Sequence, residues 1–106
     1  MNAKNQMTAW DYWLQGNRYY DLREYESAIE SYSYAITKKS DIVIFYKDRG
    51  YTYAEMGENE KALSFYTKAI ELNPEYKEGY LDRAEVYYLM GEGEKAVADD
   101  EIAAKL

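Results

Sequence analysis

The sequence predicts an all-α protein, a solenoid of three antiparallel helix pairs, because one pattern recurs three times along the chain. Tyrosine returns every 34 residues, at Tyr12, Tyr46 and Tyr80. Four further columns keep this step: Tyr19, Tyr53 and Tyr87; Glu24, Glu58 and Glu92; Ala28, Ala62 and Ala96; Ala35, Ala69 and Ala103. A fixed period of this size indicates stacked units of supersecondary structure, each burying its apolar face against the next. The three copies span residues 9–42, 43–76 and 77–106.

Each copy divides into two helix-length stretches separated by a short breaker. The breakers are Leu22-Arg23-Glu24, Met56-Gly57-Glu58 and Met90-Gly91-Glu92. Gly57 and Gly91 stand where the end of a helix favours a left-handed residue. We therefore predict helices at about 9–22, 25–38, 43–56, 59–72, 77–90 and 93–105. No alternating strand pattern competes with this assignment.

Residues at the joints between copies support the same boundaries. Asn73 and Pro74 are predicted to end one helix, and Thr8 and Asp41 are predicted to cap the helices that follow them. Within each copy, small residues fall on both members of the helix pair, at Gly16, Gly50 and Ala84 and at Ala28, Ala62 and Ala96. Small side chains let the paired helices approach closely, while the tyrosines fill the space around the contact.

The second copy resembles a tetratricopeptide repeat, whose pattern combines aromatic, small and proline positions. Its matching residues are Tyr46, Arg49, Gly50, Tyr53, Ala62, Tyr66, Ala69 and Pro74. The first copy has Ser40 at the proline position, and the third has Asp100 at an aromatic one. The resemblance covers everything after residues 1–8, a short N-terminal segment, so residues 1–106 are predicted to form one domain. It implies a right-handed superhelix with a concave surface.

Composition and charge narrow the classes of partner. The chain has 106 residues, 14 tyrosines, no cysteine and a net charge of −7. This charge disfavours nucleic acid and favours a basic partner, although an acidic surface that serves only solubility is the alternative. No apolar run approaches the ~20 residues of a membrane span. The N-terminus lacks an apolar signal core, so we expect a cytoplasmic protein.

Catalysis receives little support from the sequence. Histidine and cysteine are both absent, which removes the commonest bases, nucleophiles and soft metal ligands. Asp99, Asp100 and Glu101 are consecutive, and consecutive residues on a helix point in different directions, so we interpret them as a solvated face. No glycine-rich phosphate loop is present. We predict a protein that is not an enzyme and needs no cofactor or metal.

The resemblance to tetratricopeptide repeats implies a binding groove along the first helix of each copy. The positions that line it in the family correspond to Trp10, Trp13, Leu14, Asn17, Tyr20 and Asp21; Ile44, Lys47, Asp48, Tyr51, Ala54 and Glu55; and Glu78, Leu81, Asp82, Glu85, Tyr88 and Leu89. The predicted site omits Leu14, Ile44, Ala54 and Leu89 from this set. Six of its members are carboxylates, which face the single cation Lys47.

Aromatic side chains exposed on a concave wall are common anchors of peptide recognition. Trp13, Tyr51 and Tyr88 are predicted to serve as anchors and to lie off the seam between helices. Trp10 has two interpretations, as a groove residue or as a cover for the open N-terminal end of the stack.

In this family, a carboxylate clamp of Lys, Asn and Arg side chains grips the C-terminal tail of heat-shock chaperones. Of its five positions, only Asn17 matches the clamp. The other four hold Trp13, Asp48, Glu78 and Asp82. An acidic tail would meet like charge there, so we do not expect a chaperone-tail adaptor of that kind.

Together these observations predict a protein-interaction module that binds a short segment with basic and apolar or aromatic residues. The alternative is a structural unit, natural or engineered, that associates end to end with itself as a homo-oligomer. Asp100 is predicted to make the last copy polar and so to cap the stack. Val97, Ile102 and Leu106 still leave apolar surface at that end.

Overall fold

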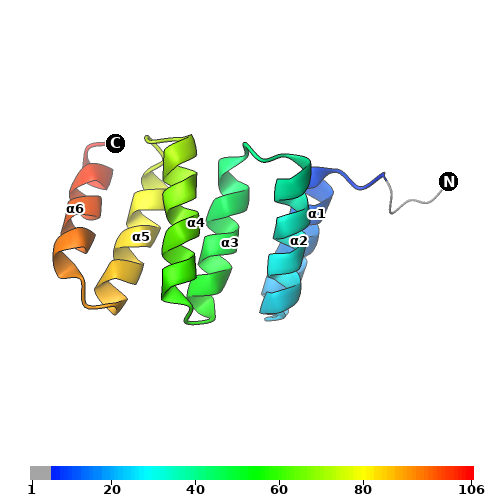
Figure 1. The fold of residues 1–106 in the computed structure, drawn as a ribbon, viewed down its shortest axis with the longest axis horizontal. Helices are drawn as coiled ribbons and strands as arrows, with labels where there is room; N and C mark the ends of the chain where they lie inside the picture. Colours follow the sequence, from blue (N-terminus) through cyan, green and yellow to red (C-terminus); the bar gives the residue numbers. More distant parts are fainter. Residues whose placement is uncertain (1–5) are drawn as a thin grey trace.

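The computed structural model describes residues 6–106 and confirms an all-α solenoid of three helix pairs. The helices are α1 (Ala9–Asp21), α2 (Tyr25–Lys38), α3 (Val43–Glu55), α4 (Asn59–Leu72), α5 (Lys77–Leu89) and α6 (Gly93–Ala104). They stand side by side in one row, with α1 and α6 at opposite ends (Figure 1). The row measures 54 × 25 × 17 Å. The part of the predicted N-terminal segment at 1–5 lies outside the described residues.

The predicted helix boundaries are confirmed to within one residue. The helices α2 and α4 match their predicted ranges, whereas α1, α3, α5 and α6 end one residue earlier than expected. Leu22, Met56 and Met90 are the capping residues after α1, α3 and α5, with ψ of 1°, −3° and 0°. Their N–H groups still bond to carbonyls of the last turn, so the pattern alone does not separate them from the helix.

The three breakers form the same turn although only two contain glycine. Gly57 and Gly91 have φ of +78°, as predicted, and Arg23 occupies the same place with φ of +61°. The N–H group of the last residue of each breaker bonds back across the turn at 2.8–2.9 Å: Glu24 to Tyr19, Glu58 to Tyr53 and Glu92 to Tyr87. A left-handed residue other than glycine is uncommon, so the repeat architecture imposes this conformation on Arg23.

The two predicted N-caps have different outcomes. Thr8 caps α1 in a capping box: its Oγ1 accepts from the Asp11 N–H at 3.1 Å, and the Asp11 carboxylate accepts from the Thr8 N–H at 2.9 Å. The prediction for Asp41 is wrong. The capping residue of α3 is Ile42, without a side-chain bond, because the helix begins one residue too late for Asp41 to cap it.

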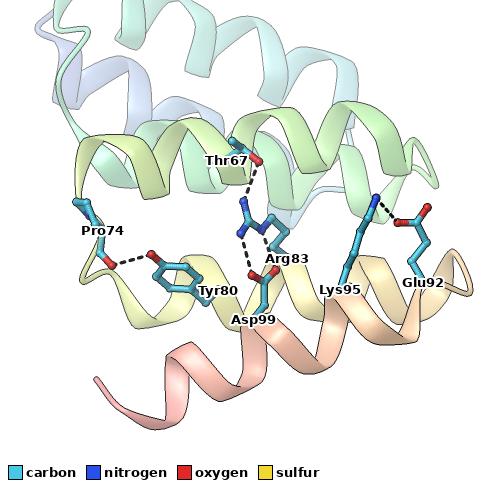
Figure 2. A network of polar contacts seen from close by, with 7 residues as sticks. All are labelled: Thr67, Pro74, Tyr80, Arg83, Glu92, Lys95 and Asp99. Atoms are coloured by element: carbon cyan, nitrogen blue, oxygen red, sulfur yellow. Dashed lines mark hydrogen bonds and ion pairs between the residues drawn. The ribbon is translucent and has the colours of Figure 1, made fainter.

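The first tyrosine column ties its helix to the preceding connection. The Tyr46 hydroxyl donates to the Ser40 carbonyl at 2.7 Å, and the Tyr80 hydroxyl donates to the Pro74 carbonyl at 2.8 Å (Figure 2). Both tyrosines are largely buried, so each hydroxyl has the partner that a buried polar group needs. The same tyrosine–carbonyl bond thus fixes the approach to α3 and to α5.

Close packing within each pair follows the predicted small residues. A Cβ atom added to Gly16 would lie 2.5 Å from the Tyr32 ring, and one added to Gly50 would lie 2.9 Å from the Tyr66 ring. Both tyrosines are fully buried. The third pair has Ala84 in place of the glycine, and it has Asp100 in place of the tyrosine. The glycine of each of the first two pairs therefore makes room for the tyrosine ring of its partner helix, and the third pair, which has no such ring, has alanine instead.

The interpretation of residues 99–101 as a solvated face is wrong for Asp99. Its side chain is buried, and its two carboxylate oxygens accept from Nε and Nη2 of Arg83, both at 2.8 Å (Figure 2). Arg83 Nη1 also donates to Thr67 at 3.1 Å, which links α5 to α4. Glu101 is exposed as expected. A helix turns its successive side chains to different sides, and one of these three faces the partner helix.

The same two repeat positions carry other chemistry in the earlier copies. In the first, the Ser31 hydroxyl donates to Gln15 Oε1 at 3.1 Å. In the second, the Arg49 guanidinium lies 4.5 Å from the centre of the Phe65 ring. The same pair of repeat positions therefore makes a neutral hydrogen bond in the first copy, a cation–π contact in the second and an ion pair in the third. The number of charged side chains in the pair rises from none to one to two.

Candidate functional site

In the first two pairs, the first helix lies on one side of the row and the second helix on the other (Figure 1). In Figure 1, α2 and α4 stand in front of α1 and α3. Besides the contacts between consecutive helices, α3 packs directly against α5. First helices thus meet across copies, which places α1, α3 and α5 on the inner side of the solenoid.

Two adjoining hollows lie along these helices and share Tyr51. The first has a volume of about 320 Å³ and is lined by Asn17, Tyr20, Tyr32, Lys47, Asp48 and Tyr51. The second is a narrower hollow of about 80 Å³, lined by Tyr51, Ala54, Glu55, Tyr66, Asp82, Glu85, Val86 and Leu89. We call these two hollows together the groove.

Eight of the predicted site residues line the groove: Asn17, Tyr20, Lys47, Asp48, Tyr51, Glu55, Asp82 and Glu85. The other predicted residues lie outside both hollows: Trp10, Trp13, Asp21, Glu78, Leu81 and Tyr88. Sequence reasoning missed Tyr32, Tyr66 and Val86, since their repeat positions serve helix packing. The sequence held one signal that Tyr32 reaches the groove: a buried tyrosine, unlike a phenylalanine, needs a partner for its hydroxyl. The structure shows that this hydroxyl donates to Asn17 Oδ1 at 2.6 Å.

Trp13 is a structural residue rather than a free anchor. It packs against the buried cluster of Ala9, Ala35 and Phe45. Its indole N–H donates to Asp48 Oδ2 at 2.6 Å, so it joins α1 to α3. The prediction that Trp13 lies off the seam between helices is wrong, because an indole at this position reaches the next copy.

Trp10 lies on the side of α1 that faces the second copy. Its ring packs edge-on against Phe45, with 4.9 Å between ring centres, and against Trp13, with 5.5 Å. The side chain remains 42% exposed. Trp10 therefore spans the joint between α1 and α3 and does not cover the outer N-terminal end of the stack.

Aromatic rings form the wall between the two hollows. The ring of Tyr51 lies 5.9 Å from that of Tyr20, and the Lys47 ammonium lies 5.3 Å from the centre of the Tyr51 ring. Burial and the nearby Glu55 carboxylate raise the pKa of Tyr20, so its hydroxyl stays neutral and can donate. Tyr51 is 40% exposed and offers a ring face to a ligand.

The acidic side chains of the groove are incompletely compensated. The pKa of Asp82 is raised to about 6, mainly by burial and also by the carboxylates of Glu85 and Glu78, against the lowering effect of Lys47. The Oδ2 atom of Asp82 is buried and has no hydrogen-bond partner within residues 6–106. Burial also raises the pKa of Asp48, although the bonds from Trp13 and Lys47 oppose this. A cation that entered here would relieve both carboxylates.

The part of α5 beyond the acidic centre is apolar and exposed. Leu81, Tyr88 and Leu89 are 42%, 51% and 68% exposed. The Tyr88 hydroxyl donates to Asp100 Oδ2 at 3.1 Å, which leaves its ring on the surface. Tyr88 thus keeps an exposed ring while its hydroxyl joins α5 to α6. Glu78, at the start of α5, accepts from the Tyr76 hydroxyl at 3.2 Å.

The described residues show neither a metal centre nor a membrane span. Within 6–106 no three acidic side chains converge in a way that could hold a metal ion. None of the described helices is long and apolar enough to cross a bilayer.

Two family models match the chain. The model described as "Tetratricopeptide repeat" matches residues 43–76, and that described as "TPR repeat" matches residues 16–57. No curated protein sequence matches the chain.

Several solved structures share the fold closely. MamA superposes with a TM-score of 0.90 at 26% identity, over 92% of this chain and 57% of the MamA chain. The second TPR of Spaghetti (RPAP3), bound to the HSP90 peptide SRMEEVD, has a TM-score of 0.88 at 25% identity, over 97% of this chain and 95% of that one. Yeast Tom70 has a TM-score of 0.86 at 29% identity, over 91% of this chain and 20% of its own.

Proposed function

Because the chain belongs to the tetratricopeptide-repeat family, we propose that it is a non-enzymatic interaction module whose groove binds a short peptide segment. The segment carries a basic side chain next to apolar or aromatic ones. The observation that supports this most strongly is the buried, unpaired oxygen of Asp82 in a groove where Lys47 is the only lining cation. A lysine or arginine of the partner supplies the missing donor.

The apolar part of the proposed ligand follows from the surroundings of the acidic centre. The ring face of Tyr51 and the exposed side chain of Leu89 border it. Aromatic side chains such as tyrosine are enriched in binding hot spots, and the contacts around them exclude water. The proposed recognition element is therefore a basic residue with an apolar neighbour.

Two of the similar structures, the first and the second TPR of Spaghetti (RPAP3), hold the same acidic peptide, whereas the groove of this chain is itself acidic. The Spaghetti domain binds the HSP90 peptide SRMEEVD. In this chain the clamp positions carry Trp13, Asp48, Glu78 and Asp82, so such a peptide would meet carboxylates and a tryptophan that is already hydrogen-bonded. The proposed preference for basic segments is thus a reversal of charge on a shared scaffold.

A peptide array tests the proposal. Its members carry one central Lys, Arg, Gln or Glu flanked by Leu, Phe, Tyr or Ser, and SRMEEVD is included as the acidic comparison. We expect signal from Lys and Arg peptides with apolar flanks, weakening as salt rises because screening shortens electrostatic reach. Equal or stronger capture of the acidic peptides would contradict the proposal.

A matched pair of variants shows whether the signal comes from the groove. Asp82→Asn removes the unpaired carboxylate, and Glu101→Gln removes one charge from the exposed face of α6, away from the groove. Asp82→Asn should weaken the best basic peptide by about tenfold, and Glu101→Gln should leave it within about twofold. Loss of affinity in both variants to the same extent would indicate nonspecific attraction to net charge.

Self-association is the second candidate, and exposed apolar residues on α6 and directly after it favour it. Val97, Ile102 and Leu106 are each more than 40% exposed. The opposite end of the stack argues against simple head-to-tail stacking. The exposed Asp11 of α1 occupies the repeat position of Phe45, which is fully buried between α2 and α3. Continuing the stack with a second copy would therefore bury Asp11.

A further inference from the structure

We propose that Lys47 is a built-in occupant of an ammonium-binding site in the groove, and that a lysine side chain of the partner displaces it. The ammonium site is argued from the geometry of this chain alone. The displacement rests on the proposed peptide-binding function.

Lys47 lies among the groups that recognise an ammonium. Its side chain is only 22% exposed and lines the larger hollow. Its Nζ atom lies 3.5 Å from Asp48 Oδ1 and 5.3 Å from the centre of the Tyr51 ring. A carboxylate and a ring face together provide charge and cation–π attraction in a partly dry setting.

The distance between the Lys47 ammonium and the Asp48 carboxylate is long because the two residues are neighbours in the chain. The two residues are adjacent on α3, and adjacent residues on a helix do not face each other. Their separation of 3.5 Å exceeds the about 2.7–2.9 Å of a charge-assisted hydrogen bond. A lysine that arrives from outside the helix is free of this restraint and can make the short contact.

The site also holds more negative charge than Lys47 compensates. Asp82 lines the adjoining hollow from α5, where the Lys47 charge acts on it, and one of its oxygens is buried without a donor among the described residues. Glu78 and Glu85, also on α5, add to the negative field at Asp82, and Asp48 adds to it from α3. A second ammonium is therefore attracted to a place that Lys47 already occupies.

Two other lysines of the chain provide a comparison. Lys61 lies 3.5 Å from Glu58 and 5.5 Å from the Tyr53 ring, so its two partners are of the same kind as those of Lys47. Lys95 is held likewise by Glu92 and Tyr87. Both side chains are at least 60% exposed. The enclosed position beside a second carboxylate distinguishes Lys47 from both.

The first test is chemical rescue with n-butylammonium chloride. Lys47→Ala empties the proposed site, and Lys61→Ala is the matched control. We expect butylammonium to produce saturable NMR shifts of the Tyr51 ring and the Asp48 and Asp82 carboxyl carbons in Lys47→Ala only, with sodium chloride at equal ionic strength as the blank. If Lys47→Ala responds no differently from wild type and Lys61→Ala, the ammonium site is disproved.

The second test uses the lysine peptide that the array ranks first. Removing the built-in competitor should tighten its binding to Lys47→Ala by about 3- to 10-fold, while Lys61→Ala stays within about twofold of wild type. Weaker binding to Lys47→Ala would overturn the displacement and make Lys47 a contact of the peptide. Butylammonium rescue without peptide binding to any form would retain the ammonium site and refute the proposed peptide function.

Discussion

Two carboxylates of the third copy show how surroundings set the role of a residue. Asp99 is buried, and Arg83 satisfies both of its oxygens in a bidentate ion pair at 2.8 Å. Asp82 has a buried oxygen without a donor, and nearby carboxylates add to its cost. A satisfied carboxylate holds the fold together once formed, whereas an unsatisfied one costs stability and remains available to a ligand.

Asp82→Asn should therefore stabilise the protein while it weakens peptide binding. The carboxyl has a pKa raised to about 6 in the folded protein, against about 3.9 in an unfolded chain. The folded state thus binds a proton more readily, so the penalty exists above pH ~6 and disappears as the pH falls through ~4. We expect Asp82→Asn to raise the free energy of unfolding at pH 7 by about 1 kcal/mol, after allowance for solvent screening.

Urea denaturation at pH 7 and pH 4.5 measures this effect. The difference between Asp82→Asn and wild type should shrink at the lower pH, and Glu101→Gln should show no such change. A difference that is equal at both pH values would mean that the Asp82 charge carries no folding penalty.

The protein should lose stability when Asp99 of the buried ion pair is replaced by a neutral polar residue, and it should lose less when Asp99 is replaced by an aromatic residue. Asp99→Asn leaves Arg83 without its counter-charge and should cost about 2–4 kcal/mol of unfolding free energy. Asp99→Phe should cost less, because the second copy already places Phe65 at 4.5 Å from Arg49 in the same two positions. Urea denaturation of both variants checks the order. A Phe variant less stable than the Asn variant would show that the third pair cannot adopt the solution used by the second.

At the scale of the helices, the residues that recur every 34 positions predicted the fold. The predictions that were wrong concern residues that do not recur in this way. A spacing of 34 residues reports which positions pack alike, so helix number, order and length followed from it. It does not report which side chain crosses to the neighbouring copy. Trp13 reaches Asp48 over 35 positions, and Arg83 reaches Asp99 over 16. These contacts depend on spatial neighbours, so the sequence did not show that Trp13, an expected groove residue, and Asp99, an expected surface residue of α6, have structural roles.

The packing of each helix pair couples one position of its first helix to one of its second. The first two pairs combine glycine with tyrosine, and the third combines Ala84 with Asp100. A Cβ at Gly50 would lie 2.9 Å from the Tyr66 ring, which is closer than such atoms pack. Asp100→Tyr alone should therefore destabilise the third pair, because Ala84 already carries that Cβ.

The double variant Ala84→Gly/Asp100→Tyr should recover about 1–3 kcal/mol relative to Asp100→Tyr, although Ala84→Gly alone is destabilising. A double-mutant cycle by thermal or urea denaturation measures this coupling. Strictly additive effects would show that the two positions do not share the space that the first two pairs suggest.

At the scale of the whole molecule, the two ends of the stack differ. The first helix presents the exposed Asp11 and Arg18 at positions where α3 carries the buried Phe45 and Thr52. The last helix has Asp100 where the earlier copies have a buried tyrosine, yet Val97 stays 45% exposed. Polar residues at terminal repeats oppose further stacking. The N-terminal end therefore resists association more strongly than α6 does.

The last helix should be the least stable part of a monomer. Within the described residues, α6 packs mainly against α5, whereas α3 and α4 have neighbours on both sides. It also begins with Gly93, which is a poor helix former by about 1 kcal/mol relative to alanine. Hydrogen exchange at low protein concentration should show the α6 amides opening locally, before those of α3 and α4.

A concentration series then separates the two candidate functions. If the groove is the interaction surface, protection of α6 should stay constant with concentration, and the lysine peptide should protect α3 and α5 instead. If the apolar face of α6 is the interaction surface, protection of α6 should rise with concentration and light scattering should report a larger mass. Replacing Val97 and Ile102 by Ser should abolish that rise while leaving peptide binding intact, since neither residue lines the groove. Rising protection that persists in this double variant would place the self-contact elsewhere on the chain and exclude α6 as its site.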